Sequence, residues 1–261
     1  MRSWFPFCAL LLLCSPTVLH AADEPPICAD RPSKSTGPCT VPAGDWQVET
    51  GLVDWTQDKS AGLSSDDTEW ATTGIKYGIS DKADVELWIT PLETSRLDAA
   101  GMHERHSSFG DTMLRVKYEL TSSNAPVQVA VDPFVTLPTA NHWLGDGKVE
   151  GGLLVPIAVP LGKSPLTLSL DPEVDVVAAD DGHGYDVATQ QVVNLGYAVN
   201  DKLSVSGEVW GMWQAGTAQR SADAAVAYLI TKRVQIDGGA NFGLNRATAD
   251  VELYTGVSAR F

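Results

Sequence analysis

Alternation of apolar and polar residues, with a period of two, runs through most of the chain from residue 44 to the last residue. It is clearest between residues 110 and 120, where every second side chain is apolar or Thr and the intervening ones are mostly charged: Thr112, Leu114, Val116, Tyr118 and Leu120. Successive side chains of a β-strand point to opposite faces of a sheet. The pattern therefore predicts an all-β chain whose sheet has one apolar face and one polar face.

The pattern divides into about twelve strands: 46–55, 68–79, 83–91, 110–120, 126–137, 148–161, 166–178, 187–199, 203–213, 221–230, 234–244 and 250–261. Most have the nine to eleven residues or so that a tilted membrane-spanning strand needs. Short connections alternate with longer ones, which we expect at 56–67, 92–109, 138–147, 179–186 and 214–220. This asymmetry is typical of outer-membrane barrels. We predict a transmembrane antiparallel up-and-down β-barrel over residues 44–261.

The N-terminal residues read as a targeting segment. Arg2 precedes an apolar run over residues 4–13, and small residues follow at Ala21 and Ala22. The run is shorter than the roughly 20 apolar residues of a spanning helix, so we predict a signal peptide over residues 1–21.

Two of the four cysteines remain in the exported chain. Cys28 and Cys39 fall in a short lead, residues 22–43, which we place in the periplasm ahead of the barrel. A cysteine pair in an exported protein predicts a disulfide.

The net charge of −15, from 33 acidic and 18 basic residues, argues against a nucleic-acid partner. Charged side chains on spanning strands must avoid lipid, so they are candidates to line the lumen: Glu86, Asp111, Arg115, Lys117, Asp171, Glu173, Asp175 and Glu208. Two interpretations stay open. The charges form a salt-bridge network that fills a narrow barrel, or they line a water-filled path that favours cations and neutral solutes over anions. No metal site, cofactor or catalytic residue is indicated.

The C-terminus supports export to the outer membrane of a Gram-negative bacterium. Phe261 ends the chain on an apolar face, which resembles the terminal strand signature that the outer-membrane assembly machinery recognises. Outer-membrane lipid and lipopolysaccharide are the other expected partners, besides a small solute. Pro133, Pro156 and Pro172 interrupt three strands, and since Pro removes a ladder donor we expect bulges there.

Several turns and strand ends carry a family resemblance: 30–32, 35–44, 109–111, 134–139 and 238–245. They resemble the outer-membrane "transporter" family named for the MetA pathway of phenol degradation. The resemblance covers nearly the whole exported chain and implies uptake of small aromatic compounds, without defined binding residues.

Passive or facilitated passage of small solutes is thus the expected function. A non-conducting structural or receptor barrel is one alternative. A barrel hydrolase is another, because His103, His106, His142 and His183 lie in the predicted long loops near several aspartates. No motif fixes a nucleophile, so we expect no enzyme.

Overall fold

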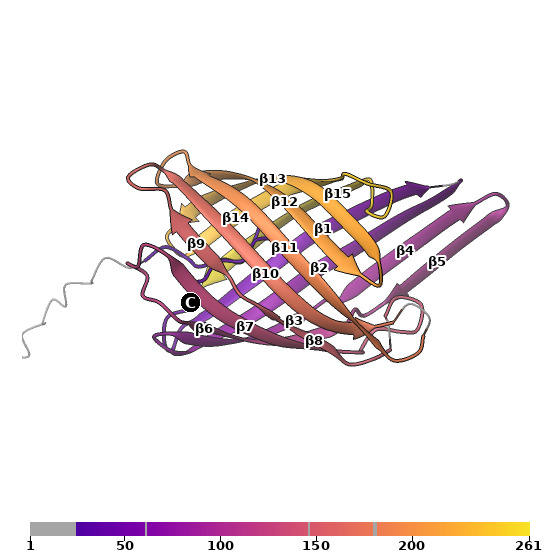
Figure 1. Cartoon of the computed structure of the whole chain (residues 1–261), viewed down its shortest axis with the longest axis horizontal. Helices are drawn as coiled ribbons and strands as arrows, with labels where there is room; N and C mark the ends of the chain where they lie inside the picture. Colours follow the sequence, from indigo (N-terminus) through magenta and orange to yellow (C-terminus); the bar gives the residue numbers. More distant parts are fainter. Residues whose placement is uncertain (1–24, 61, 146, 180–181) are drawn as a thin grey trace, which may run out of the picture.

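The computed structural model describes residues 25–60, 62–145, 147–179 and 182–261, and these form strands and connecting turns (Figure 1). The predicted signal peptide, residues 1–21, lies outside the described residues. The strands are β1 (Trp46–Ser60), β2 (Leu63–Ser80), β3 (Ala83–Ile89), β4 (Leu92–Ala99), β5 (Met102–Ser108), β6 (Thr112–Glu119), β7 (Gln128–Leu137), β8 (Glu150–Leu154), β9 (Ile157–Pro160), β10 (Leu166–Ala178), β11 (Tyr185–Ala198), β12 (Leu203–Gln214), β13 (Thr217–Thr231), β14 (Val234–Gly243) and β15 (Val251–Arg260). Within the described stretches, no helix has the length and apolar character needed to cross a membrane.

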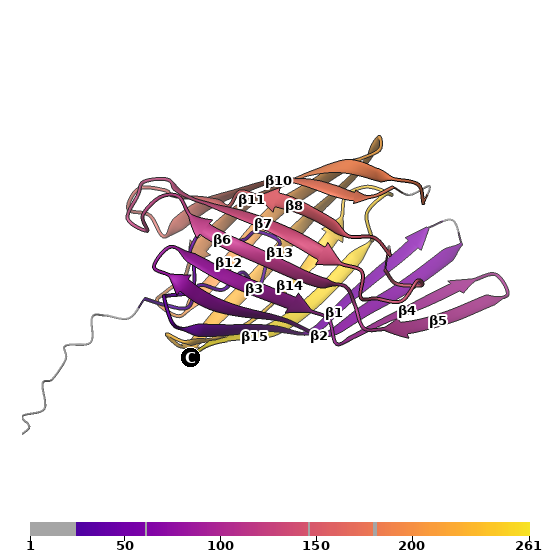
Figure 2. The same cartoon turned by 90° about the horizontal axis from the view of Figure 1, so that it is seen from below.

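The sheet closes on itself, because β1 pairs with β15 on one side and with β2 on the other. Every neighbouring pair is antiparallel. Three spans are each broken in two, namely β3 with β4, β5 with β6, and β8 with β9. The result is the predicted twelve-stranded barrel, seen from two sides in Figures 1 and 2.

The two faces of the wall differ as the alternation predicts. On β6, Val116 is 44% exposed and Tyr118 is 46% exposed, whereas Lys117 between them is 1% exposed. The same contrast recurs around the barrel, where apolar side chains cover the outside and buried polar ones fill the inside. An outer surface of this kind belongs in hydrocarbon, and closure leaves no strand edge unpaired there.

The connections at one end of the barrel are mostly short, including 81–82, 161–165, 199–202 and 232–233. The C-terminus lies at this end (Figure 1). Aromatic residues gather near it on the outer surface, and the rings of Trp46 and Tyr77 lie 4.7 Å apart. By analogy with other outer-membrane barrels, we assign this end to the periplasm.

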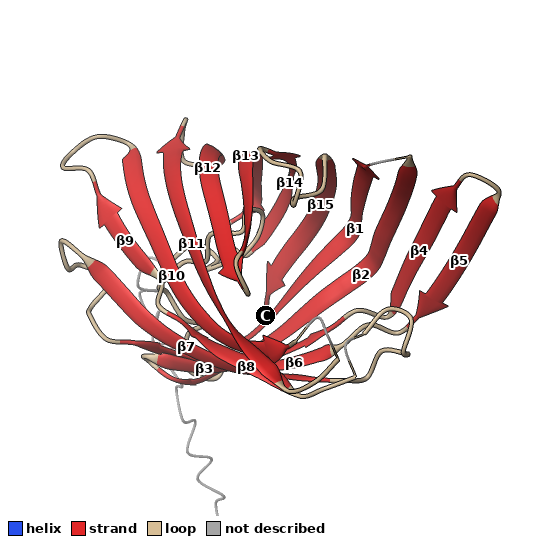
Figure 3. Ribbon diagram, turned by 45° about the vertical axis from the view of Figure 1, so that its right-hand side comes forward, coloured by secondary structure: helices blue, strands red, loops and turns tan. Residues whose placement is uncertain are grey.

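Three of the predicted long loops are wrong, because strands continue through them. Residues 56–60 and 63–67 belong to the hairpin of β1 and β2, residues 214–220 to a hairpin with a two-residue turn at 215–216, and residues 92–109 contain the hairpin of β4 and β5. These extensions are mostly polar on both faces, with scattered apolar residues, so they carry no regular alternation. Their ladder pairing nevertheless continues beyond the part of the wall that is apolar outside. Figure 3 shows the hairpin of β4 and β5 beside β2, with which β4 pairs, and β5 at the outer edge.

A bulge reverses the faces of β1 and β2 halfway along. Leu52 and Ala71 drop out of the ladder, and Ala71 has a φ of 56°. Beyond the bulge Glu69 lines the interior, whereas Trp70, which strict alternation from Lys76 places inside, is 43% exposed. One unpaired residue in a strand with period two moves every later side chain to the opposite face.

The three prolines lie close together on neighbouring spans. Pro156 breaks the span between β8 and β9, while Pro133 pairs with Leu153 and Pro172 with Gln191 inside continuous strands. Backbone bonds bridge the break, since Val155 N donates to Pro172 O and Ala130 N donates to Pro156 O. The strand itself breaks only at Pro156 among the three prolines, but the ladder between β6 and β7 is also interrupted at Pro133, and β10 has no ladder partner in β8 or β9 at Pro172.

The strained backbone at Ala71 gives a test of the bulge. A left-handed conformation costs a residue other than glycine about 1–2 kcal/mol. We expect Ala71→Gly to raise the free energy of unfolding in detergent by about 0.5–1 kcal/mol, and Ala71→Val to lower it. The matched control is Ala224→Gly on extended β13, which should lower it. Equal effects of the two glycine substitutions would contradict the bulge.

Candidate functional site

The interior of the barrel holds the segment that the sequence analysis placed ahead of it. We call residues 25–43 the plug. Val41 is 1% exposed and Asp30 is 8% exposed, and both contact strands of the wall. The plug enters at the short-turn end, where Ile27 N donates to Lys232 O. It therefore fills the periplasmic half of the lumen.

Asp30 of the plug joins two buried lysines of the wall. Its carboxylate oxygens lie 2.5 Å from Lys76 Nζ and 2.6 Å from Lys117 Nζ. Lys76 Nζ is also 2.6 Å from Glu49 Oε1, and Glu86 Oε1 is 3.6 Å from both ammonium groups. Burial raises the pKa of Asp30, but the attraction of Lys117 and Lys76 outweighs it and holds that pKa well below its usual range.

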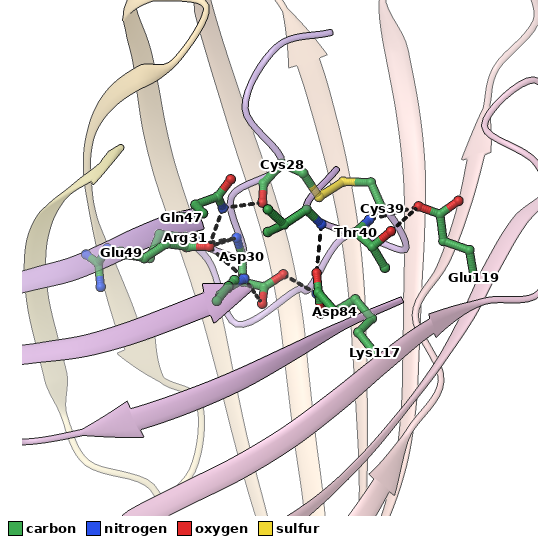
Figure 4. The surroundings of a disulfide bond; sticks show 12 residues. Cys28, Asp30, Arg31, Cys39, Thr40, Gln47, Glu49, Asp84, Lys117 and Glu119 are labelled. Carbon is green, nitrogen blue, oxygen red and sulfur yellow. Dashed lines mark hydrogen bonds and ion pairs between the residues drawn. A yellow bond between two sulfur atoms is a disulfide. The ribbon is translucent and has the colours of Figure 1, made fainter. Parts of the chain in front are cut away.

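Wall carboxylates also bind the plug through its backbone. Each accepts hydrogen bonds from plug N–H groups, as Figure 4 shows for three of them. The pairs are Glu49 with Asp30 N and Arg31 N, Glu208 with Lys34 N and Ser35 N, Glu119 with Thr40 N, and Asp84 with Val41 N. Hydrogen bonds to an ionised acceptor are stronger than neutral ones. The plug backbone thus supplies hydrogen-bond donors to four acids of the wall, in addition to the ammonium group of Lys76 that already contacts Glu49.

Glycines in the wall make room for the plug. Arg31 Nη2 lies 2.9 Å from Asp237 Oδ1, and a Cβ at Gly256 would come within 2.3 Å of its Nε. A Cβ at Gly78 would come within 2.1 Å of Pro42 O. Side chains at these two positions would collide with the plug, so the wall is shaped to hold it.

A disulfide joins Cys28 to Cys39 and closes a loop within the plug (Figure 4). Asp30, Arg31, Lys34 and Ser35 all lie inside this loop. Cross-linking reduces the conformational freedom of the free segment, which lowers the entropic cost of docking it.

The predicted lumen residues occupy three settings. Glu86, Lys117 and Glu208 contact or face the plug. Asp171, Glu173 and Asp175 lie on β10, where Gln190 Nε2 donates to Glu173 and Asp175, and Asp171 is 1% exposed. Arg115, which forms an ion pair with Asp132, and Asp111 line an open cavity above the plug.

This main cavity has a volume of about 500 Å³. The plug forms its floor through residues 30–34 and Thr36, and Trp88 forms part of its wall. An adjoining hollow of about 240 Å³ is lined by five carboxylates, with no basic residue among its described lining: Asp54, Asp67, Glu69, Glu93 and Glu252. The cavity therefore presents a negative surface to solutes.

Of the histidines of the hydrolase alternative, His103 and His106 lie on β5, His142 in the connection from β7 to β8, and His183 in that from β10 to β11. His103 Nδ1 is 2.6 Å from Asp98 Oδ1, and the His106 ring stacks on Trp143 with centroids 4.3 Å apart. Neither contact brings a hydroxyl nucleophile to the imidazole. No cluster of three or more potential metal ligands occurs among the described residues.

Sequence reasoning placed this segment ahead of the barrel and left open whether it plugs the pore, although two signals pointed to the plug. The inward acids outnumber the inward bases, so they need donors from elsewhere. Glycine weakens the interior of a strand, so Gly78 and Gly256 in spanning strands indicate that another group needs the space of a side chain there.

The Asp30 cluster leads to a stability prediction. Asp30→Asn removes the shared counter-ion of Lys76 and Lys117, and breaking a buried pair costs about 3–5 kcal/mol. We expect a loss of that size in the free energy of unfolding, measured by denaturant titration in detergent. Asp98→Asn on the exposed hairpin is the control and should leave it unchanged. A loss no larger than that of the control would show that the plug does not depend on this cluster.

Solved structures of low sequence identity share the fold. An outer membrane channel from Pseudomonas putida F1 matches with a TM-score of 0.64 and 16% identity, over 85% of this chain and 97% of that chain. The β domain of the Bordetella autotransporter BrkA matches with a TM-score of 0.52 and 11% identity, over 83% and 98%. A search of curated protein sequences finds no match.

A family model matches residues 29–261, which include most of the plug and the whole barrel. This agrees with the resemblance carried by the turn and strand-end motifs. The chain belongs to the family described as "Putative MetA-pathway of phenol degradation".

Proposed function

We propose that the protein is an outer-membrane channel for small cations and neutral solutes, whose conductance is restricted by its plug. The observation that carries this proposal is the cavity of about 500 Å³ inside the wall, lined by polar side chains and floored by the plug. A barrel whose interior was filled only by packed side chains would leave no such space, because protein interiors are close-packed.

Charge sets the preference among solutes. Arg31, Lys34 and Arg115 are the basic residues of the main cavity, and each is paired with a carboxylate. In the adjoining hollow Glu252 is the partner of Lys34, whereas Asp54, Glu69 and Glu93 share a described lining that contains no basic residue. A cleft lined by one sign of charge concentrates the opposite sign and repels its own.

The family description and the similar fold of the Pseudomonas putida protein support the same proposal. The family is described by phenol degradation, and the Pseudomonas putida protein is an outer membrane channel. Aromatic compounds therefore belong in the panel of test solutes. We further propose that lipopolysaccharide surrounds the outer half of the barrel and that Phe261, which is 67% exposed, is recognised during assembly.

Two alternatives have different tests. A structural or receptor barrel would conduct nothing. A hydrolase using His103 and Asp98 would cleave peptides or phospholipids, and His103→Ala would abolish that turnover.

Single-channel recording with the full exported chain tests the proposal. We expect small conductance steps and a reversal potential that favours cations. Replacing Asp54, Glu69 and Glu93 by their amides should lower the cation preference by about twofold or more, since these carboxylates create the field. Replacing Asp98 and Glu104 by their amides, on the exposed hairpin, should change little. A folded barrel that never conducts and does not swell liposomes in any solute would refute the channel.

A further inference from the structure

Beyond the bulge, β1, β2 and the hairpin of β4 and β5 continue as a sheet at the end of the barrel opposite to the C-terminus, which is the extracellular end (Figure 1). We call residues 53–60, 62–70 and 92–109 the rim sheet. Glu69 and Glu93 line the main cavity, so the residues that alternate with them face outward. The two faces of the rim sheet can therefore be compared residue by residue.

The rim sheet separates its charges by face. All three of its described lysine and arginine residues face outward, whereas six of its eight described acids face inward. The outward charges are Lys59, Arg96, Arg105, Asp66 and Asp98, and the inward acids are Asp54, Asp58, Asp67, Glu69, Glu93 and Glu104. The bases of this acidic chain thus gather where the rim meets the outer surface of the membrane.

The outward face is also layered along the strands of β2 and the hairpin. Its last apolar side chains form an apolar row, in which Trp70 and Leu92 are ladder partners and Phe109 follows β5. Two residues further out comes a hydroxyl row, and two further again a charged row: Thr68, Thr94 and Ser107, then Asp66, Arg96 and Arg105. Trp70 Nε1 donates to Thr94 Oγ1 at 3.5 Å, so the first two rows are in contact.

This order sets the depth of the arginines. A strand rises about 3.3 Å per residue, so Arg96 lies about 13 Å beyond Leu92 along the strand, or about 9 Å along the membrane normal at a tilt of about 45°. The headgroup layer is about 5–8 Å thick on each side of the hydrocarbon. A long arginine side chain spans the small difference, so the guanidinium groups meet the headgroups.

The two arginines lack counter-ions. Arg96 and Arg105 are ladder partners, and like charges directly opposite each other destabilise a sheet. Arg96 Nε lies 2.7 Å from Asp98 Oδ2, which leaves its terminal nitrogens without a described partner. Arg105 forms no ion pair with any described residue. One phosphate group between them would pair with both, because guanidinium groups hold phosphate oxygens through parallel hydrogen bonds.

An open cavity of about 470 Å³ lies over these rows. Its lining comprises Asp66, Thr68, Thr94, Ser95, Arg96, Arg105, His106 and Ser107. Asp66 is the one acid of the described lining, and it already accepts from Gln57 Nε2 at 2.9 Å. The cavity thus offers two cations to an anionic group and, beside them, hydroxyls that suit a sugar.

We propose that the outward face of the rim sheet binds a phosphorylated glycolipid of the outer leaflet, the lipid A part of lipopolysaccharide. A phosphate group lies between Arg96 and Arg105, the sugar lies against the hydroxyl row, and the acyl chains lie against the apolar row. The inference deepens the proposed lipopolysaccharide environment by giving it a site, and it does not depend on whether the barrel conducts.

Native mass spectrometry of the full exported chain, folded in detergent and titrated with diphosphorylated lipid A, tests this site. We expect one lipid A to bind at least about tenfold more tightly than the same lipid without its phosphates, because hydrogen bonds between charged groups are lost. Arg96→Gln combined with Arg105→Gln should weaken lipid A binding by about tenfold or more. Arg220→Gln is the matched control, since Arg220 also faces outward but lies opposite Gly211, and it should bind as the unchanged protein does.

Equal binding of the dephosphorylated lipid would overturn the site, and so would an equal loss in Arg220→Gln, because any outward arginine would then suffice. Inorganic diphosphate distinguishes a free anion from the lipid. It should bind at least about tenfold less tightly than lipid A, since it buries no acyl chain, and binding of equal strength would overturn the lipid assignment. Conductance in bilayers without lipopolysaccharide is read separately. Lipid A binding without conductance keeps the site and refutes the channel, whereas conductance without lipid A binding refutes the site alone.

Discussion

The structure depends on how its buried wall charges are paired inside a closed barrel. Closure gives each membrane-spanning strand a hydrogen-bonded neighbour on both sides, but it leaves the inward carboxylates in a confined space where an isolated charge is very costly. The plug resolves this through Asp30, which pairs with Lys76 and Lys117, and through backbone N–H groups that donate to four wall acids. The plug and the wall therefore make one electrostatic unit.

Much of the wall could be predicted because hydrocarbon imposes a simple rule on it. Wherever one face meets lipid and the other meets the lumen, as at Val116 and Lys117, alternation is strict and the strand is found. The prediction failed beyond the apolar belt, where both faces meet water. One signal was available there: the dipeptide Ala-Gly occurs at residues 61–62, 100–101 and 215–216, and its glycines have φ of 82–84°. The last two of these dipeptides form two-residue turns of hairpins.

The site was less predictable than the wall, for a physical reason. The eight lumen candidates share one property, inward charge on a strand, which does not tell a carboxylate that holds the plug from one that meets a solute. Which of the two a carboxylate does depends on its height along the barrel axis relative to the plug. The plug is not a strand of the sheet, so no strand register fixes its position in advance. Trp70 shows the same limit, because a single bulge at Ala71 changed the face on which it lies.

Height along the axis also separates stability from transport. Acids level with the plug, such as Glu49 and Asp84, accept hydrogen bonds from fixed N–H groups of the plug, which weakens their field. Acids above the plug, such as Asp54 and Glu69, face open cavity instead. A substitution in the lower group acts first on docking of the plug, and one in the upper group acts first on solutes. The division explains how so acidic a lumen can be tightly packed at one end and open to solutes at the other.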